Sequence, residues 1–436
     1  MKRLAITASL LLLAGSALAE TRSITVDVQG ENVPVVLDLL SVRNAVGADF
    51  PFDWADLRVS VDGQDIPFQI DDTDLNGRVS AGDQLAFVAS GQATITVSDE
   101  PLDPVSHEAA LEVTTDGDVT VISSLSGNGF TVEVGSEGLA RITGFGDVSE
   151  TLAAELGILR FAGYPESTWW ADEQYGPHEE YTILEDGGAR FVRTEVLPAG
   201  PARVAVITEY ASDRFVGLTQ RIVTSVYAGG DVDVHSQVTF GGYSDMMKLQ
   251  HMATSVLSQA DPEAQHVIPG FRRLAWADQL GVSSEDYFAE RDAVSDGVIA
   301  FNSNDNLSPL YWGAAYIFAS AEPWRAAYSD DLGIAVIEAA YEVPEIAEDY
   351  DEWLSGNTWV FESQEFRTGV FKWIADEFMS YDATSDVTMN EPNHYLPGTV
   401  IDFHYLYSVR DADSAADAAE QAAALAAALA SVNLEE

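Results

Sequence analysis

The sequence predicts an all-β protein with a small N-terminal β domain, a large antiparallel β-sandwich and a C-terminal alanine-rich helix. Many short segments alternate apolar and polar residues with a period of two, as half-buried strands do. Turns containing Gly or Asp separate them, which favours antiparallel meanders over a parallel sheet with helical crossovers. The alanine-rich stretch stands at the end of the chain and has the composition of a helix.

The start of the chain has the pattern of a secretory signal peptide. Lys2 and Arg3 precede a largely apolar run over residues 4–14, and residues 17–19 (Ala-Leu-Ala) offer a small-x-small cleavage site. We expect residues 1–19 to be removed and the protein to be secreted or periplasmic. The apolar run is too short to span a bilayer, and no later one reaches the roughly 18 residues that a membrane helix needs.

The composition is strongly acidic. The 436 residues include 71 Asp and Glu against 21 Lys and Arg, a net charge of −50. This balance argues against binding nucleic acid or anionic lipid, and it suits a saline habitat such as that of a marine bacterium. The absence of cysteine excludes disulfides, thiol catalysis and cysteine–zinc sites. With 47% hydrophobic residues, a chain of this length can rely on its core.

Residues 20–100 are expected to form the N-terminal β domain. An acidic segment with Pro101 and Pro104 then reads as a linker over residues 101–106. Within the domain, Asp62-Gly63 has the composition of a hairpin turn. The predicted strands are residues 23–28, 33–39, 57–61, 64–70 and 84–88.

An acidic loop lies between the last two of these strands. Its oxygen-bearing residues recur at alternate positions and surround a glycine, Gly77, at the point where a calcium loop turns sharply. The expected ligands are Asp72, Asp74, Asn76, the carbonyl of Arg78, Ser80 and Asp83. The pattern predicts a structural calcium site with a dissociation constant of about 10⁻⁴–10⁻³ M, as in extracellular modules. The alternative is an acidic turn between two strands that binds no metal.

The same region resembles a known module. A strand ending in residues 66–72 (Ile-Pro-Phe-Gln-Ile-Asp-Asp), the acidic turn, and residues 83–88 (Asp-Gln-Leu-Ala-Phe-Val) are similar to the N-terminal barrel-like domain of some bacterial polysaccharide-utilisation proteins. Relatives of exo-acting rhamnogalacturonan lyases are among them. The resemblance covers roughly residues 30–90 and implies a role in carbohydrate use. No catalytic motif of that family can be transferred to this chain.

Residues 107–410 are expected to form the large sandwich, and residues 411–436 the C-terminal helix. The predicted strands include residues 110–114, 119–123, 130–134, 190–197, 202–210, 218–227, 232–240, 297–301, 333–338 and 399–407. Such a series resembles, at the level of fold, the large sandwich of many polysaccharide lyases and mutarotase-like domains. The helix is expected over residues 414–432, after an N-cap region at residues 411–414.

The strongest candidate for chemistry is the irregular segment at residues 169–181. Trp169 and Trp170 are natural stacking platforms for sugar rings. Tyr175 and His178 are the residue types that β-elimination needs, one as a base for the C5 proton and one as an acid for the leaving oxygen.

Two other interpretations of this segment stay open. Glu179 lies beside a second glutamate, Glu180, and close to Asp172, so the segment also offers carboxylate pairs for glycoside hydrolysis. Glu179 would otherwise contact the substrate. The structural alternative is that the Trp residues lie in the core and that His178 bonds a backbone carbonyl.

Two further segments offer cations in a chain that has few. If residues 245–252 form a strand, Lys248 and Gln250 share one face and His251 lies on the other. Lys248 would neutralise a uronate carboxylate, and so would Arg272 of the Arg pair at residues 272–273. His251 is either a catalytic group or a structural histidine, and the Arg pair has ordinary salt bridges as its alternative.

These patterns favour a secreted enzyme that cleaves a uronate-containing polysaccharide by β-elimination. The expected ligand is a polysaccharide or oligosaccharide, with calcium as a structural ion. The alternatives are a glycoside hydrolase and a non-catalytic carbohydrate-binding or surface protein. The chain has no Gly-x-Ser-x-Gly elbow, His-Glu-x-x-His motif, phosphate-binding loop or dinucleotide fingerprint, which argues against the common esterases, zinc proteases, kinases and dehydrogenases.

Overall fold

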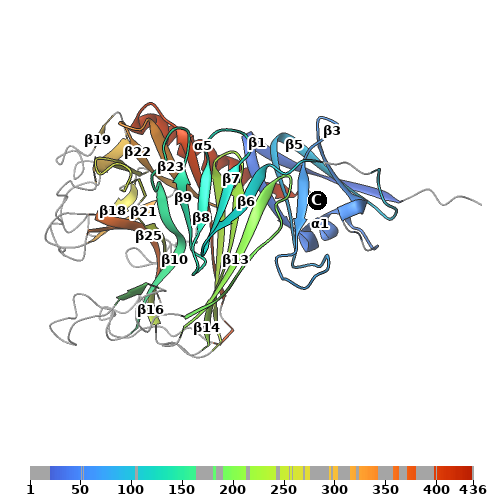
Figure 1. Cartoon of the computed structure of the whole chain (residues 1–436), viewed down its shortest axis with the longest axis horizontal. Coiled ribbons are helices and arrows are strands. Elements are labelled where there is room, and N and C mark those ends of the chain that lie inside the picture. The colour runs from blue at the N-terminus through green and yellow to red at the C-terminus, as the bar shows by residue number, and fades with distance from the viewer. Residues whose placement is uncertain are drawn as a thin grey trace, which may run out of the picture.

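The computed structural model describes the chain from Glu20 to Leu434, with internal gaps (Figure 1). The gaps are residues 51, 53, 104–106, 164–179, 183–189, 213–216, 242–245, 255, 258, 269–270, 275–293, 296–297, 303–314, 321–323, 342–356, 363–370, 380–396 and 399. Within the described ranges, the backbone alone is described for residues 54, 158–163, 180–182, 246–254, 268, 271–274, 294–295, 299, 301–302, 315–320, 357–362, 371–379, 401 and 433–434.

The all-β prediction is confirmed, because three antiparallel sheets make up the described body of the protein. The smallest sheet is built from the N-terminal residues together with one short strand from the other end of the chain. In pairing order its strands are β27 (Asn433–Leu434), β1 (Thr21–Asp38), β5 (Gln84–Ser98), β2 (Leu57–Val61) and β3 (Gln64–Asp65), with β4 (Phe68–Asp71) on β5. A short 3-10 helix, η1 (Trp54–Asp56), precedes β2.

Two segments that were predicted as separate strands form a single long strand in this sheet. Residues 23–28 and 33–38 both belong to β1 and pair with β5 throughout, with a bulge between Val28 and Val33. The prediction of strand at residue 39 is wrong, because helix α1 (Leu39–Val46) starts there and ends at Gly47 in the left-handed conformation. Its buried residues Leu39, Val42 and Val46 follow helical spacing. In a helix of eight residues, this pattern is too short to be told from the apolar end of the preceding strand.

The larger part of the chain forms two sheets. The ten-stranded sheet runs β12 (Arg190–Val196), β13 (Arg203–Ala211), β14 (Leu218–Tyr227), β15 (Asp231–Phe240), β26 (Val400–Asp411), β23 (Ile334–Ala340), β22 (Trp324–Ser329), β17 (Gln265–Ile268), β20 (Val298–Asn302) and β19 (Val294–Ser295). The eleven-stranded sheet runs β18 (Phe271–Leu274), β21 (Ala315–Ser320), β24 (Asn357–Glu362), β25 (Phe371–Met379), β16 (Met246–Thr254), β10 (Ala153–Gly163), β9 (Ala140–Gly144), β8 (Thr131–Val134), β7 (Val119–Ser124) and β6 (Leu111–Asp116), with β11 (Glu180–Thr182) on β10.

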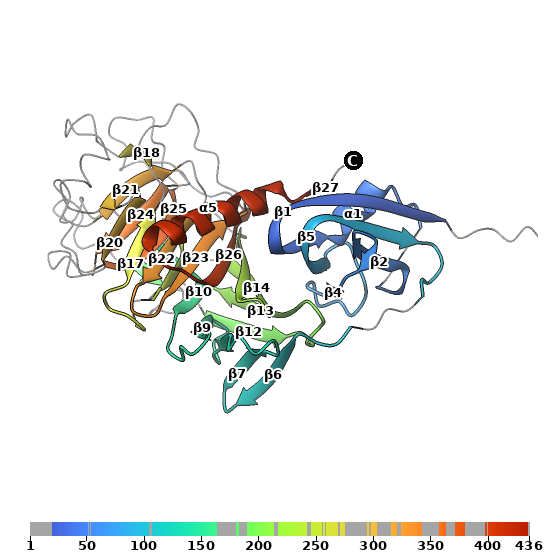
Figure 2. The ribbon, with the colours of Figure 1, turned by 90° about the horizontal axis from the view of Figure 1, so that it is seen from above.

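One core lies between the two large sheets and a second lies outside them. Val204 and Val206 of β13 share the first core with Val132 and Val134 of β8. The second core joins the small sheet, the outer face of β22 and β23, and helix α5 (Ala415–Ser431). Figure 2 shows α5 lying across the ten-stranded sheet and leading into β27 beside β1. The end of the chain thereby connects the small sheet to the sandwich.

The predicted C-terminal helix is confirmed, with Ser414 as its N-cap. The Ser414 Oγ accepts a hydrogen bond from the Asp417 backbone N–H at 3.1 Å, so one of the free amide groups at the helix start is satisfied. Among the described residues, no helix combines the length and apolarity that crossing a membrane requires.

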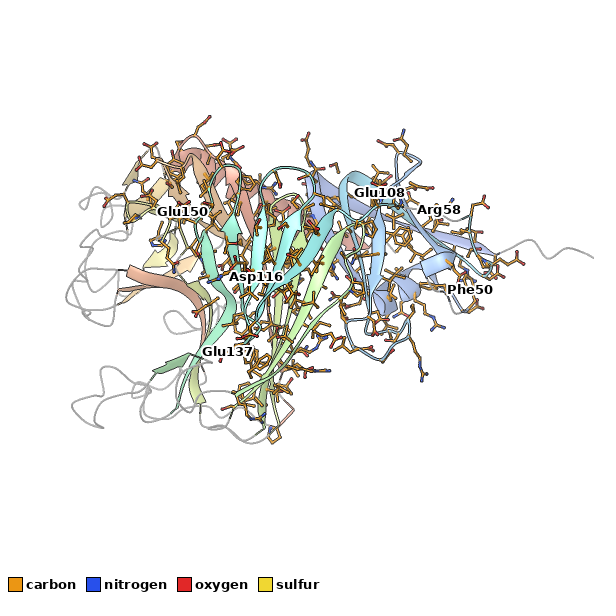
Figure 3. The ribbon with its side chains drawn as sticks, viewed as in Figure 1. Phe50, Arg58, Glu108, Asp116, Glu137 and Glu150 are labelled. Carbon is orange, nitrogen blue, oxygen red and sulfur yellow. The ribbon has the colours of Figure 1, made fainter. Side chains whose placement is uncertain are left out.

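The acidity of the sequence is visible on the surface. Figure 3 labels Glu108, Asp116, Glu137 and Glu150, and all four residues are exposed. These four residues lie in separate parts of the chain between the segment before β6 and the segment before β10. Such a surface disfavours polyanions over a wide area.

A buried histidine in β17 makes stability depend on pH. Burial, and next the charge of Arg325, lower the pKa of His266 to about 4. The unfolded chain has a histidine pKa near 6.5, so it binds more protons than the folded chain between these values. This contribution to stability is fully present above about pH 6.5 and is lost as the pH falls towards 4.

We therefore expect His266→Gln to reduce the difference in free energy of unfolding between pH 7 and pH 5 by about 1–2 kcal/mol. Urea unfolding of both proteins at the two pH values measures this difference. An unchanged difference in the His266 variant would contradict the assignment.

Candidate functional site

The acidic loop between β4 and β5 is the most closely built polar site among the described residues. All six predicted ligand residues lie in the described part of the chain. Ligand atoms of Asp72, Asp74 and Asp83 lie within 4.8 Å of one another. Gly77, at φ +73°, takes the left-handed turn that the pattern predicts, and a Cβ on Gly82 would stand 3.1 Å from Asp74 Oδ2.

Neutral donors bond most of the carboxylate oxygens in this loop. Asp72 accepts from the backbone N–H groups of Asn76 and Gly77 at 2.9 and 2.7 Å. Asp74 Oδ2 accepts from Ser80 Oγ and from the Asn76 side-chain amide, both at 2.7 Å. Asp83 Oδ2 accepts from the Ser80 backbone N–H at 2.6 Å. Within the described residues, none of the three carboxylates forms a salt bridge with Lys or Arg.

One carboxylate oxygen is left over. Asp83 is fully buried, and its Oδ1 has no hydrogen-bond partner. Burial raises the pKa of Asp83 to about 6 and the charges of Asp74 and Asp72 act in the same direction, although the backbone N–H groups of Ser80 and Thr73 act to lower it. The arrangement thus concentrates negative charge around an oxygen that has no donor.

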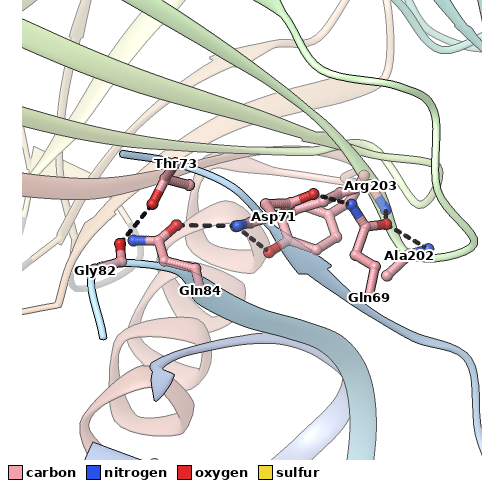
Figure 4. Close-up of polar contacts among 8 residues, drawn as sticks. Gln69, Asp71, Thr73, Gly82, Gln84, Ala202 and Arg203 are labelled. Atoms are coloured by element: carbon pink, nitrogen blue, oxygen red, sulfur yellow. Dashed lines mark hydrogen bonds and ion pairs between the residues drawn. The ribbon is translucent and has the colours of Figure 1, made fainter. Parts of the chain in front are cut away.

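The opposite side of the loop docks on the ten-stranded sheet. Asp71 Oδ2 accepts from Arg203 Nε at 2.7 Å, and both side chains are almost completely buried. Arg203 also donates to Gln84 Oε1 at 3.0 Å, and Gln69 Oε1 accepts from the Arg203 backbone N–H at 2.9 Å (Figure 4). Arg221 donates to the Thr73 carbonyl. The small sheet is therefore joined to the sandwich by buried polar bonds.

A second polar cluster lies on the same sheet and was only partly visible in the sequence. His235 and His404 are direct neighbours on β15 and β26, with ring centroids 4.8 Å apart. Their Nε2 atoms bond to carboxylates on each other's strands, His235 to Asp402 at 2.9 Å and His404 to Asp233 at 2.7 Å. We call these four residues, with Tyr341 stacked 3.8 Å from His404, the histidine row.

In the histidine row, both Nε2 atoms are bonded to carboxylates, so the row offers no free catalytic base. Burial alone would lower the pKa of His235, but the hydrogen bond to Asp402 and the charge of Asp233 raise it. Burial and the neighbouring Asp233 raise the pKa of the Tyr341 hydroxyl well above its usual value. We assign this row no catalytic role, because the Nε2 atoms are bonded and the hydroxyl is buried. The period-two alternation over residues 231–238 is the sequence signal that places Asp233 and His235 on one face.

Most residues predicted for sugar chemistry lie outside the described residues. These are Trp169, Trp170, Asp172, Tyr175, His178 and Glu179. Three others lie on strands whose backbone is described: Lys248 and His251 on β16, and Arg272 on β18. The prediction of a strand at residues 245–252 is confirmed from Met246 onward. The roles assigned to all these residues stay predictions.

The backbone register brings two of the candidate segments together. Position 162 of β10 pairs with Glu180 of β11 and with Lys248 of β16, and position 160 pairs with Thr182 and Gln250 in the same way. His251 pairs with Leu159 and, on the far side, with Asp376. Arg272 belongs to the far end of the same sheet, on β18, which pairs with β21.

Comparison with known proteins leaves the family open. No family model and no curated protein matches this chain. Among solved structures, the galactose 1-epimerase of Lactobacillus acidophilus aligns with 10% identity and a TM-score of 0.39 over 70% of this chain and 100% of that chain. A putative aldose 1-epimerase from Escherichia coli K12 aligns with 11% identity and a TM-score of 0.32 over 70% of this chain and 99% of that one.

An α-N-acetylgalactosaminidase from Bifidobacterium bifidum aligns with 10% identity and a TM-score of 0.33, over 71% of this chain and 38% of that chain. These alignments are too weak to assign an activity to this chain. The fold assignment rests on the three sheets described above. The resemblance of residues 30–90 to a module of polysaccharide-utilisation proteins stays a prediction.

Proposed function

We propose that this chain is an exported protein that acts on carbohydrate and cleaves a uronate-containing polysaccharide by β-elimination. The observation that supports it most is the register across β11, β10 and β16. Ala162 pairs with Glu180 on one side and with Lys248 on the other. The segment with Tyr175 and His178 lies in the connection between β10 and β11.

This register gives the approximate distance between positions 180 and 248 in the proposed site. Adjacent strands lie about 4.8 Å apart, so positions 180 and 248 are separated by roughly 10 Å across the sheet. The connection at residues 164–179 leaves β10 and returns as β11, and its two ends therefore lie one and two strands from β16. A uronate held beside this connection would have a lysine position within reach of its carboxylate.

β-Elimination needs three kinds of group. A base removes the C5 proton beside the uronate carboxylate, the C4–O bond breaks as the C4=C5 double bond forms, and an acid protonates the leaving oxygen. Neutralising the carboxylate lowers the cost of the negative charge that develops next to it. The proposed roles are base and acid for Tyr175 and His178, neutralisation for Lys248 or, as the alternative, Arg272, and sugar contacts for Trp169, Trp170 and Glu179. His251 stays an alternative catalytic group.

The proposal is tested by ultraviolet absorbance during incubation with a panel of uronate polysaccharides. The conjugated double bond left by β-elimination absorbs, whereas hydrolysis leaves none. We expect Tyr175→Phe to lower the rate by roughly 10²-fold or more while substrate binding is kept, since a positioned acid or base contributes about 10²–10⁴-fold. Glu179→Gln alters a proposed sugar contact in the same segment and should therefore raise the KM more than it lowers the kcat.

The other outcomes separate the remaining function classes. New reducing ends without absorbance, lost in Glu179→Gln, would contradict the lyase and assign the carboxylates to hydrolysis. Binding of sugar without either product would replace the enzyme with a carbohydrate-binding protein. Melting curves of both variants must match that of the wild type, so that a loss of rate is not a loss of folded protein.

A further inference from the structure

We propose that the acidic loop at residues 72–83 binds one calcium ion and thereby fixes the small sheet on the sandwich. This inference involves none of the residues assigned to β-elimination. It rests on Asp83, whose buried Oδ1 has no hydrogen-bond partner and whose carboxylate contributes one ligand atom to the cluster with Asp72 and Asp74. A buried carboxylate oxygen without a donor indicates a missing positive partner.

The charge of the loop points in the same direction. Three carboxylates share a region of 4.8 Å, and in the described part of the chain their bonds come from neutral amides and one hydroxyl. Neutral donors reduce the mutual repulsion of carboxylates but do not cancel it. A bound divalent cation would cancel most of it, and Asp83 Oδ1 would gain a ligand bond.

The ligand types favour calcium over other metals. Every candidate ligand is an oxygen, and the loop has no histidine or cysteine, which zinc and copper prefer. Besides the three carboxylates, the loop offers the Asn76 amide oxygen, the Ser80 hydroxyl and backbone carbonyls. Calcium accepts six to eight such oxygens in flexible geometry, whereas magnesium demands near-octahedral geometry and keeps its water.

Neighbouring residues of this segment make contacts on opposite sides. Asp72, Asp74 and Asn76 bond to one another and to the rest of the loop. Residues 71, 73 and 75 contact the ten-stranded sheet. Asp71 pairs with Arg203, the Thr73 carbonyl accepts from Arg221, and Leu75 packs against Leu197, Ala205, Ile207 and Val223.

Leu75 connects the bonds inside the loop to the contacts with the sheet. It lies in the left-handed region, with φ +58°, which is unfavourable for a residue with a branched side chain. This backbone turns the chain between Asp74 and Asn76 while the Leu75 side chain packs on the sheet. A cation bound by Asp72, Asp74 and Asn76 would therefore also keep Thr73 and Leu75 in place against the sheet.

The test is titration of the metal-free protein with CaCl2, followed by calorimetry and by thermal melting. We expect one site of roughly 10⁻⁴–10⁻³ M and a rise in the melting temperature of about 3–6 °C at saturating calcium. Asp74→Asn removes one charge from the exposed part of the loop and should lower the calcium affinity at least tenfold. Asp83→Asn should do the same, and since Asp83 is buried, Asp74→Asn is the variant that remains decisive if Asp83→Asn fails to fold.

Surface charge alone also attracts calcium to so acidic a protein, so a matched control is needed. Asp118→Asn makes the same change at an exposed carboxylate in the turn between β6 and β7 and should leave the affinity unchanged. Equal affinities in the wild type and Asp74→Asn would overturn the site. Hydrogen exchange checks the second half of the proposal: calcium should slow exchange in β13 and β14 as well as in the loop, and protection confined to the loop would overturn the link to docking.

Discussion

Arg203→Met is expected to lower the free energy of unfolding by about 3–5 kcal/mol, because it leaves a buried carboxylate without its cation. Arg203 is fully buried, and its Nε donates to Asp71 Oδ2 at 2.7 Å. The guanidinium also donates to Gln84, so its loss leaves a second acceptor unsatisfied. Chemical unfolding at neutral pH measures the change.

An exposed pair provides the comparison. Arg193 and Glu209 form a salt bridge of the same length, 2.7 Å, but the two side chains are 48% and 28% exposed. Arg193→Met should therefore cost only about 0.2–1 kcal/mol. A similar cost for the two Arg→Met changes would contradict the view that burial makes the Asp71 pair important.

A double variant tells desolvation from loss of packing. Removing the partner carboxylate as well, in Asp71→Leu with Arg203→Met, replaces the ion pair with apolar groups. We expect the double variant to be more stable than Arg203→Met alone, since the Asp71 carboxylate no longer stays buried without its cation. A double variant that is as unstable as the sum of the single changes would mean that packing accounts for the effect.

Ala422→Glu in helix α5 is expected to cost about 3–5 kcal/mol. Ala422 is completely buried in the core that α5 shares with β1, β22 and β23. A glutamate there would bury an unpaired charge and overfill a site that holds one methyl group. Because α5 lies between the small sheet and the sandwich, we expect thermal unfolding of both parts to shift together (Figure 2).

The same helix supplies the control. Ala424 lies two residues further on and is exposed, so Ala424→Glu should change the free energy of unfolding by no more than about 0.5 kcal/mol. Both changes introduce the same side chain and the same helix propensity. Equal destabilisation by the two variants would contradict the assignment of the buried face.

Local patterns predicted the strands and the C-terminal helix well. Residues 218–227 are rich in β-branched residues and form β14. Residues 232–240 alternate with a period of two and belong to a strand that starts one residue earlier, at Asp231. Ser414 was recognisable as an N-cap because capping depends on residues within one turn. The acidic loop was equally visible, since its possible ligands all lie within twelve residues.

Bonds between residues far apart in sequence could not be predicted from the sequence. Arg203 and Asp71 are 132 residues apart, and neither has a neighbour in sequence that indicates the other. The reciprocal pairing of His235 with Asp402 and of His404 with Asp233 depends on β15 lying next to β26, which strand patterns alone do not specify. The predicted sugar-binding residues concentrate in an irregular connection, where periodicity gives no information on geometry.

The contact between the two ends of the chain has a consequence for the order of folding. The backbone N–H of Gln29 bonds to Ser431 Oγ across 402 residues, and β27 pairs with β1. Synthesis makes β1 first, whereas helix α5 and the strand β27 that pairs with β1 are made last. Contacts between residues so far apart in sequence form slowly, so this edge of β1 stays unpaired until the C-terminal segment has folded onto it.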